Sequence, residues 1–188
     1  MNVWNLKAYI YQKARQLPGF SHILDAETNN LKKLVVDFKP DSVLDIGVGT
    51  GATLSIYDND MIIYGIDFSF KMLKQVRMHH PDLTGIQADA CQLPFQKKSF
   101  SFISAIGLTE YLSDLTGFFE EVDLILKPGG HLLITFAPNT FFNYLRLAWG
   151  SRLFLQSEKE WYNSIPTHWK RIGHNASWLQ RQFLYQKQ

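Results

Sequence analysis

The chain has 188 residues, 46% of them hydrophobic and 19% charged, and this balance predicts a folded domain and not a disordered polypeptide. Its 19 basic and 17 acidic side chains leave a net charge of +2, so electrostatics indicate no nucleic-acid partner. The single cysteine, Cys91, excludes an internal disulfide and is typical of a reducing compartment, so we expect a cytoplasmic location.

The chain opens with two predicted helices, over 6–17 and 28–38, whose apolar residues recur at helical spacing. A first strand is predicted at 42–46, followed by a glycine-rich loop and a short helix that begins at Ala52. No apolar run near the start is long enough for a signal peptide or for the roughly 20 residues of a membrane span.

The middle of the chain alternates strands with amphipathic stretches. Strands are predicted at 61–66 and 84–88, and between them lies a helix that Ser69 caps and that stops before Pro81. A further strand with interleaved serines follows at 100–106.

A helix at 115–126 ends in the stop signal KPGG, and a fifth strand follows at 131–136. Strands separated by intervals of this length are typical of right-handed βαβ units. The sequence therefore predicts an α/β fold: a Rossmann-like, doubly wound, mainly parallel sheet between two layers of helices, with ligands at the carboxyl ends of its strands.

The stretch VLDIGVGTGA, residues 43–52, raises the question of which cofactor the glycine loop serves. Gly47, Gly49 and Ala52 satisfy the dinucleotide pattern G-x-G-x-x-G/A, and Asp67 follows Gly47 by 20 residues, where a ribose-binding acid belongs. A nicotinamide cofactor is therefore one open reading of this loop.

Asp45 favours a different ligand. A carboxylate two residues before the first glycine would lie near the pyrophosphate of a dinucleotide, and two like charges ~6 Å apart repel by roughly 3 kcal/mol at an effective dielectric near 20. S-adenosylmethionine carries no phosphate but has a sulfonium and an ammonium, which an acid attracts. Three successive strands end in such acids: Asp45, Asp67 and Asp89.

Four segments in this order, VLDIGVGTG, YGIDFSFKML, IQADACQLPF and LKPGGHLLITF, resemble the class I S-adenosylmethionine-dependent methyltransferases, in particular the branch that acts on small molecules, quinones and lipids. The resemblance covers about residues 31–136. It implies one domain over 1–188, with an N-terminal helical cap (1–39), a cofactor-binding core (40–136), and a C-terminal cap and helix (137–188).

The resemblance also implies roles for individual residues. The glycines would let the backbone approach the cofactor, Asp45 would orient its amino acid end, and Asp67 would hold the ribose hydroxyls. Phe68 and Met72 would flank the adenine, whose amino group Asp89 and Ala90 would read. The implied cofactor-binding residues are Asp45, Gly47, Val48, Gly49, Gly51, Asp67, Phe68, Met72, Asp89, Ala90 and Ile106.

Two departures from the family pattern leave the catalytic residues unassigned: an acid expected in the fourth strand is replaced in Phe100-Ser101-Phe102, and a frequent histidine is replaced in GLTEYL. Methyl transfer needs a general base only where the acceptor holds its proton tightly. The candidate bases are His22, His168, His174, Glu110 and Tyr9. We predict no metal site.

The regions before and after the core are rich in aromatic residues, which is typical of a pocket for a small apolar or aromatic acceptor and equally of simple packing. The stretch FFNYLRLAWGSRLFL, residues 141–155, mixes basic and large apolar residues and indicates peripheral membrane contact as a further hypothesis.

Members of the family continue after the fifth strand with a helix and an antiparallel hairpin. Here residues 173–188, GHNASWLQRQFLYQKQ, resemble that helix, so we expect either an improvised strand at 182–186 or an incomplete hairpin. An incomplete hairpin would leave the strand at 131–136 as an open edge, through which two copies would form a homodimer.

The sequence thus predicts a methyltransferase that converts S-adenosylmethionine to S-adenosylhomocysteine. A catalytically inactive relative that binds the cofactor or a partner stays open as the alternative, and a nicotinamide oxidoreductase is a third.

Overall fold

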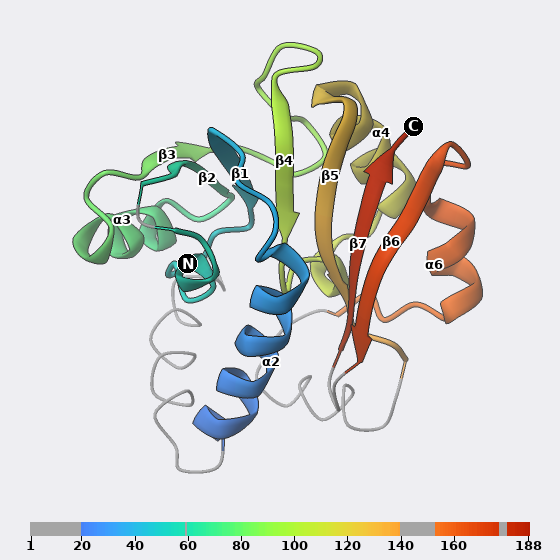
Figure 1. The fold of residues 1–188 in the computed structure, drawn as a ribbon, viewed down its shortest axis with the longest axis horizontal. Helices are drawn as coiled ribbons and strands as arrows, with labels where there is room; N and C mark the ends of the chain where they lie inside the picture. Colours follow the sequence, from blue (N-terminus) through green and yellow to red (C-terminus); the bar gives the residue numbers. More distant parts are fainter. Residues whose placement is uncertain (1–19, 59, 140–152, 177–179) are drawn as a thin grey trace.

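A computed structural model describes residues 20–58, 60–139, 153–176 and 180–188 of the chain. They contain one seven-stranded sheet in the order β3-β2-β1-β4-β5-β7-β6 (Figure 1). The first five strands in this order are parallel, and β7 runs antiparallel to both of its neighbours. The strands are β1 Ser42–Ile46, β2 Ile62–Asp67, β3 Thr84–Gln87, β4 Phe100–Ala105, β5 Leu126–Phe136, β6 Trp169–Ala176 and β7 Arg181–Lys187.

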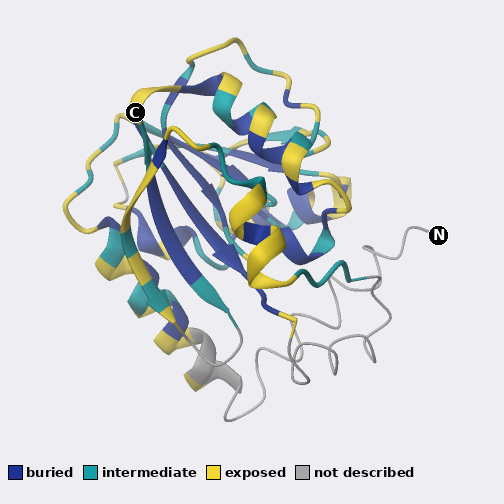
Figure 2. Ribbon diagram, turned by 90° about the vertical axis from the view of Figure 1, so that its right-hand side faces the viewer, coloured by how far each residue is buried: buried dark blue, intermediate teal, exposed yellow. Residues whose placement is uncertain are grey.

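Helices cover both faces of this sheet. The described helices are α2 Phe20–Val35, α3 Phe70–His79, α4 Leu115–Ile125 and α6 Glu158–Ser164, with 3-10 turns η1 at Leu54–Ile56 and η2 at Thr109–Tyr111. Apolar residues of α2, α3 and η1 pack on one face, whereas those of α4 and α6 pack on the other. The buried strands lie between helices whose outer sides are exposed (Figure 2). The predicted three-layer α/β/α fold is confirmed.

Local sequence signals account for the helix starts. Ser69 accepts a hydrogen bond from the Met72 backbone at 3.4 Å, as an N-cap should, so the predicted start of α3 is confirmed. Asp114 caps α4 in the same way through the Gly117 N–H at 2.9 Å. The helix predicted from Ala52 is wrong, because only the three-residue turn η1 forms there. The helix predicted at 6–17 lies outside the described residues.

The predicted C-terminal helix is also wrong. Most of residues 173–188 form the end of β6 and the whole of β7, so the hairpin is complete and the strand anticipated at 182–186 is real. Phe183 and Tyr185 pack on the α4 and α6 face while Leu184 packs on the α2 face. A strand buried on both faces is apolar without alternation, and by periodicity it cannot be told from a buried helix.

The complete hairpin removes the open edge on which the dimer hypothesis relied. From His131 to Phe136, β5 pairs with β7 residue by residue. The fifth strand is therefore an interior strand, and dimerisation through its edge is contradicted. The C-terminal cap-and-helix division at 137–188 is wrong in its helix, while the other domain boundaries stay predictions.

Candidate functional site

The backbone N–H groups of the glycine loop between β1 and η1 donate hydrogen bonds to other groups of the protein. The Gly47 and Val48 N–H groups donate to the Ile66 carbonyl at 2.8 and 2.9 Å, and the Gly51 N–H donates to the Val48 carbonyl at 2.9 Å. The Gly49 N–H donates to the Asp67 carboxylate at 2.9 Å. A pyrophosphate would need such donors and the start of a regular helix. The loop therefore does not fit a dinucleotide.

Two glycines of the loop are required for different reasons. At Gly51 the backbone is left-handed, with φ +79°, and an added Cβ would lie 2.6 Å from Val76 on α3. At Gly49, with φ +55°, the nearest atom to an added Cβ is the Gly47 carbonyl oxygen at 3.8 Å. Gly51 is thus needed for packing, whereas at Gly49 an added Cβ would make only an ordinary contact and the left-handed backbone is what favours glycine.

Asp67, at the end of β2, holds the loop to the start of α3. One of its carboxylate oxygens accepts the Gly49 N–H, and the other accepts the Ser69 N–H at 2.7 Å. A carboxylate offers about four lone-pair positions, so about two are left for a ligand's hydroxyl groups. Burial raises the pKa of Asp67, and the hydrogen bonds from Ser69 and Gly49 oppose that rise.

Asp45 lies in the interior, not on the rim of the site. Its side chain is only 2% exposed, and one carboxylate oxygen accepts a hydrogen bond from the Ser104 hydroxyl at 2.5 Å. Burial raises the pKa of Asp45 to about 7, the Ser104 hydrogen bond lowers it, and the charge of Asp67 raises it further. Asp45 is thus an acid whose charge responds to what binds nearby.

The tips of β3 and β2 carry the residues expected around an adenine. Asp89 is exposed and accepts the Cys91 N–H at 2.9 Å, which orders the turn that contains Ala90. Phe68, which directly follows β2, is 58% exposed, whereas Met72 is buried in α3. Burial and nearby acids raise the pKa of Cys91 to about 11, so its thiol is no thiolate nucleophile.

Ile106 is half-buried and directly follows β4. The residues after it are joined to β5 by two hydrogen bonds. The Gly107 N–H donates to the Thr135 hydroxyl at 2.7 Å, and the Thr109 hydroxyl donates to the Thr135 carbonyl at 2.9 Å. Ser104 and Thr135 were not among the predicted site residues. The signal was present, because each is a polar residue between apolar neighbours near the end of its strand.

The structure brings the predicted residues to one edge of the sheet. They follow β1, β2, β3 and β4, and the bonds from Gly49 to Asp67 and from Ser104 to Asp45 link neighbouring strands there. The four described candidate bases lie on other elements, and Tyr9 lies outside the described residues. His22 is exposed on α2, His174 is exposed on β6, and His168 binds Asp123 at 2.9 Å. Glu110 is buried in η2.

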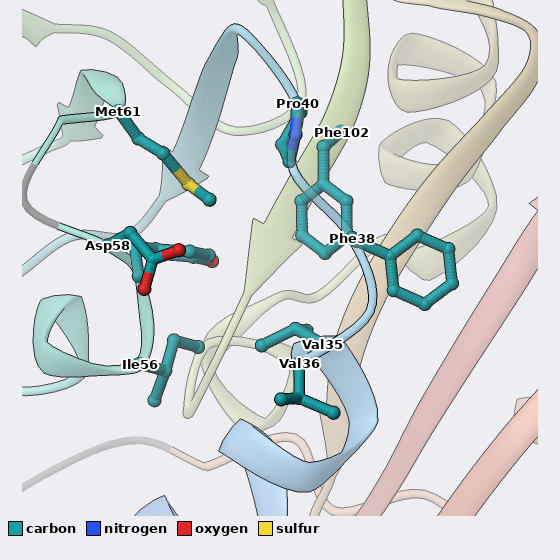
Figure 3. Close-up of a pocket in the computed structure, with 9 residues that line it drawn as sticks. Val35, Val36, Phe38, Pro40, Ile56, Asp58, Met61 and Phe102 are labelled. Atoms are coloured by element: carbon teal, nitrogen blue, oxygen red, sulfur yellow. The ribbon is translucent and has the colours of Figure 1, made fainter.

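Two hollows lie away from the glycine loop. One, of about 20 Å³, lies beside the amino ends of β1 and β2, between Met61, Phe38 and Phe102 (Figure 3). This is room for about one water, at the opposite end of the strands from the acids. The other, of about 400 Å³, lies between α6 and the carboxyl end of β5, lined by Phe136, Glu158, Trp161, Tyr162, Arg171, His174, Ala176, Arg181 and Phe183.

Comparison with known proteins agrees with this geometry. Residues 44–134 match the family described as "Methyltransferase domain". A demethylmenaquinone methyltransferase of Renibacterium salmoninarum is 31% identical over 121 residues, which cover 61% of this chain and 51% of that protein. The chain thus spans about half the length of this curated relative.

Solved structures share the fold at low sequence identity. A SAM-dependent methyltransferase of Thermotoga maritima superposes with a TM-score of 0.73 at 16% identity, over 98% of this chain and 100% of that one. The geranyl diphosphate C-methyltransferase of Streptomyces coelicolor, in complex with S-adenosyl-L-homocysteine, gives 0.72 at 12% identity, over 87% and 76%.

Part of the chain is thus similar in sequence to methyltransferases, and its fold is that of solved S-adenosylmethionine-dependent methyltransferases. In the part of the chain that the structure describes, no helix combines the length and the apolar character that a membrane span requires.

Proposed function

We propose that this protein is an S-adenosylmethionine-dependent methyltransferase acting on a small, apolar or aromatic acceptor. The observation that carries the proposal is the hydrogen bond from the Gly49 N–H to the Asp67 carboxylate. It puts an acid inside the glycine loop, where a dinucleotide would need its diphosphate. A phosphate-free, cationic nucleoside is the ligand that this arrangement favours.

The residues at the sheet edge suit the parts of such a cofactor. The remaining lone pairs of Asp67 would accept the ribose hydroxyls, and the lack of a side chain at Gly49 would let the amino acid end approach the backbone. Asp89, with the backbone of Ala90, would read the adenine amino group, and exposed Phe68 would stack on the ring. Val48 and Ile106 would supply apolar contacts beside it.

The cofactor, when bound, supplies an electrophilic methyl group on sulfur. The acceptor's nucleophilic atom would take that methyl group from sulfur, and the acceptor's proton would leave to water. What the chain contributes is alignment: effective molarity from holding both reactants at the tips of β1 and β4 supplies several kcal/mol of barrier reduction. We assign no base to the reaction.

The acceptor class is supported by aromatic residues at the carboxyl end of β5 and by a relative. Phe136, at the end of β5, lines the hollow of about 400 Å³ and stacks on Trp161 with 4.7 Å between ring centroids. Apolar rings with a few polar groups are typical of sites for small molecules. The relative from Renibacterium is named for an aromatic quinone precursor.

Three expectations about the surroundings stay predictions. Peripheral membrane contact was placed on 141–155, most of which lies outside the described residues. The cytoplasmic location and the absence of a nucleic-acid partner depend on composition alone. None of them enters the proposal.

Isothermal titration calorimetry with S-adenosylhomocysteine tests cofactor binding directly. We expect the wild type to bind, and Asp67→Ala to lose about 2 kcal/mol, roughly thirtyfold in affinity, because a charge-assisted hydrogen-bond acceptor is removed. Asp82→Ala, an exposed acid beyond α3, is the matched control and should bind as the wild type does. Binding of NAD instead of S-adenosylhomocysteine would overturn the proposal.

Turnover is tested separately, with labelled S-adenosylmethionine and a panel of quinols, phenols and apolar amines. Methylation of at least one aromatic acceptor is the expected result. Tight cofactor binding without transfer to any acceptor would favour the inactive relative instead.

A further inference from the structure

Three polar side chains meet directly before the glycine loop. Asp45 and Ser104 are register partners on β1 and β4, and the Ser104 hydroxyl donates to the Asp45 carboxylate at 2.5 Å. Both lie on the face of the sheet that α2 and η1 cover, because Val43 and Phe102, two residues earlier on each strand, pack there. Tyr57 follows η1 on this same face.

The Tyr57 hydroxyl is a buried donor without an acceptor. Among the described residues it has no hydrogen-bond partner. Burial raises the pKa of Tyr57 well above its ordinary value, the negative charge of Asp45 raises it further, and Ser104 lowers it. The Tyr57 ring packs edge-on against Phe102, two residues before Ser104 on β4, with 6.3 Å between the ring centroids, so the side chain lies on the same buried face as Ser104 and Asp45.

The order of donors and acceptors in this cluster is fixed by its chemistry. Ser104 has one hydroxyl proton, and that proton is directed to Asp45. The Ser104 oxygen can then only accept from a third group, and the Tyr57 O–H, buried on the same face of the sheet, is the candidate donor. In a chain Tyr57 to Ser104 to Asp45, each hydrogen bond polarises the next and strengthens the hold on the carboxylate.

We propose that Tyr57 and Ser104 are positioning residues that set the charge of Asp45, which serves as the buried counter-charge for the amino acid end of the cofactor. The inference depends on the proposed function, since a cationic ligand is what that charge would attract. Asp45 would act through the field in the low-dielectric interior, as its 2% exposure leaves little surface for direct contact.

The role makes cofactor binding depend on pH. With a pKa of about 7 in the free protein, Asp45 carries a proton in weak acid, and a bound ammonium would displace that proton. Affinity should then rise with pH, by up to tenfold per unit below about 7, and level off above. Asp67 and Tyr57 also face Asp45, and the pKa of Asp67 is raised too, so variants must identify the titrating group.

The test is calorimetric binding of S-adenosylhomocysteine from pH 5.5 to 8.5. Tyr57→Phe and Ser104→Ala should shift the midpoint of the affinity profile to higher pH and weaken binding at pH 7 by roughly three- to tenfold, because each removes a donor from the chain. Ser104→Thr keeps the hydroxyl and should restore the wild-type profile. Tyr64→Phe, a tyrosine of β2 that packs on Phe100, is the matched control.

A merely structural role predicts something different. Tyr57→Phe deletes an unpaired buried oxygen, so it would raise the melting temperature and leave the pH profile unchanged. Profiles of Tyr57→Phe and Tyr64→Phe that superpose on the wild type would overturn the inference while the proposed function stands. A wild type that binds no S-adenosylhomocysteine at any pH would remove the proposed function, and the inference with it.

Discussion

Asp45 and Asp123 are two carboxylates of one fold with opposite surroundings. Asp45, on β1, is buried with one hydroxyl donor, and its pKa is raised. Asp123, on α4, accepts from the Trp169 indole at 2.7 Å and from His168 at 2.9 Å, and lies 3.1 Å from the Lys187 ammonium. Burial alone would raise the pKa of Asp123, but these hydrogen bonds lower it.

This difference separates an acid that stabilises the fold, Asp123, from one whose charge depends on what binds nearby, Asp45. Asp123 has its donors in place before any ligand arrives, and it ties α4 to both strands of the hairpin. Asp45 has one donor and lies on the strand that leads into the glycine loop. A carboxylate left short of donors in a folded protein holds unfavourable energy that a cationic ligand can relieve, and such groups gather at functional sites.

The largest expected effect on stability, and the strongest test of the contrast between the two acids, is that of Asp45→Asn. Between the ordinary pKa of 3.8 and the native value of about 7, the native state binds more protons at Asp45 than the unfolded state. Its contribution to the free energy of unfolding is therefore lost as pH rises across this range, by about 4 kcal/mol in total.

Asp45→Asn should remove that slope, so the variant gains on the wild type as pH rises from 4 to 8. Urea unfolding at each pH measures it, with exposed Asp41→Asn as the control. Parallel pH profiles for Asp45→Asn and the wild type would show that Asp45 is ionised throughout, like Asp123.

Asp123→Ala should have the next largest effect, a loss of about 3 kcal/mol in the free energy of unfolding. It leaves the Trp169 indole and the Lys187 ammonium without their shared acceptor, although Lys187 keeps the Asp123 and Leu126 carbonyls. Because the pKa of Asp123 is lowered, its stabilisation is present above the ordinary pKa and is lost as pH falls through the native value.

The difference from the wild type should therefore be full at pH 7 and shrink in acid. Chemical denaturation at pH 7 and pH 3 measures it, with Glu120→Ala on the exposed side of α4 as the control. A loss equal at both pH values would mean that packing, and not the charge, holds the hairpin. Cofactor affinity should stay unchanged.

The two acids also mark what a sequence can reveal. The strand-tip acids and glycines were predictable, because each has a local signal: an apolar run that ends in a polar residue. The bond from Ser104 to Asp45 spans 59 positions and depends on the register between β1 and β4, which no local pattern encodes. Tyr57 follows the point at which a helix was wrongly predicted to begin, Ala52, so its burial on the α2 face of the sheet was out of reach.

The hairpin was missed for a related reason. Gln182, Phe183, Leu184 and Tyr185 are all buried, and a run without alternation has no face to assign. What makes it a strand is pairing with β5 and β6, together with Trp169 and Lys187 reaching Asp123. These contacts are far apart in the chain, so tertiary structure decides the conformation of this segment.

The smallest expected effect on stability is that of removing His168, one of the hydrogen-bond partners of Asp123. His168 is the most exposed donor to Asp123, with 46% of its side chain accessible, so solvent screens the pair. His168→Ala should lower the free energy of unfolding by less than about 1 kcal/mol at pH 7, because Trp169 and Lys187 still satisfy the carboxylate. A double-mutant cycle with Asp123→Ala isolates the pairwise energy. A coupling well above 1 kcal/mol would mean that His168 is held in place by Asp123, and that the energy of this α4 acid also depends on one partner, as that of Asp45 is proposed to depend on Ser104.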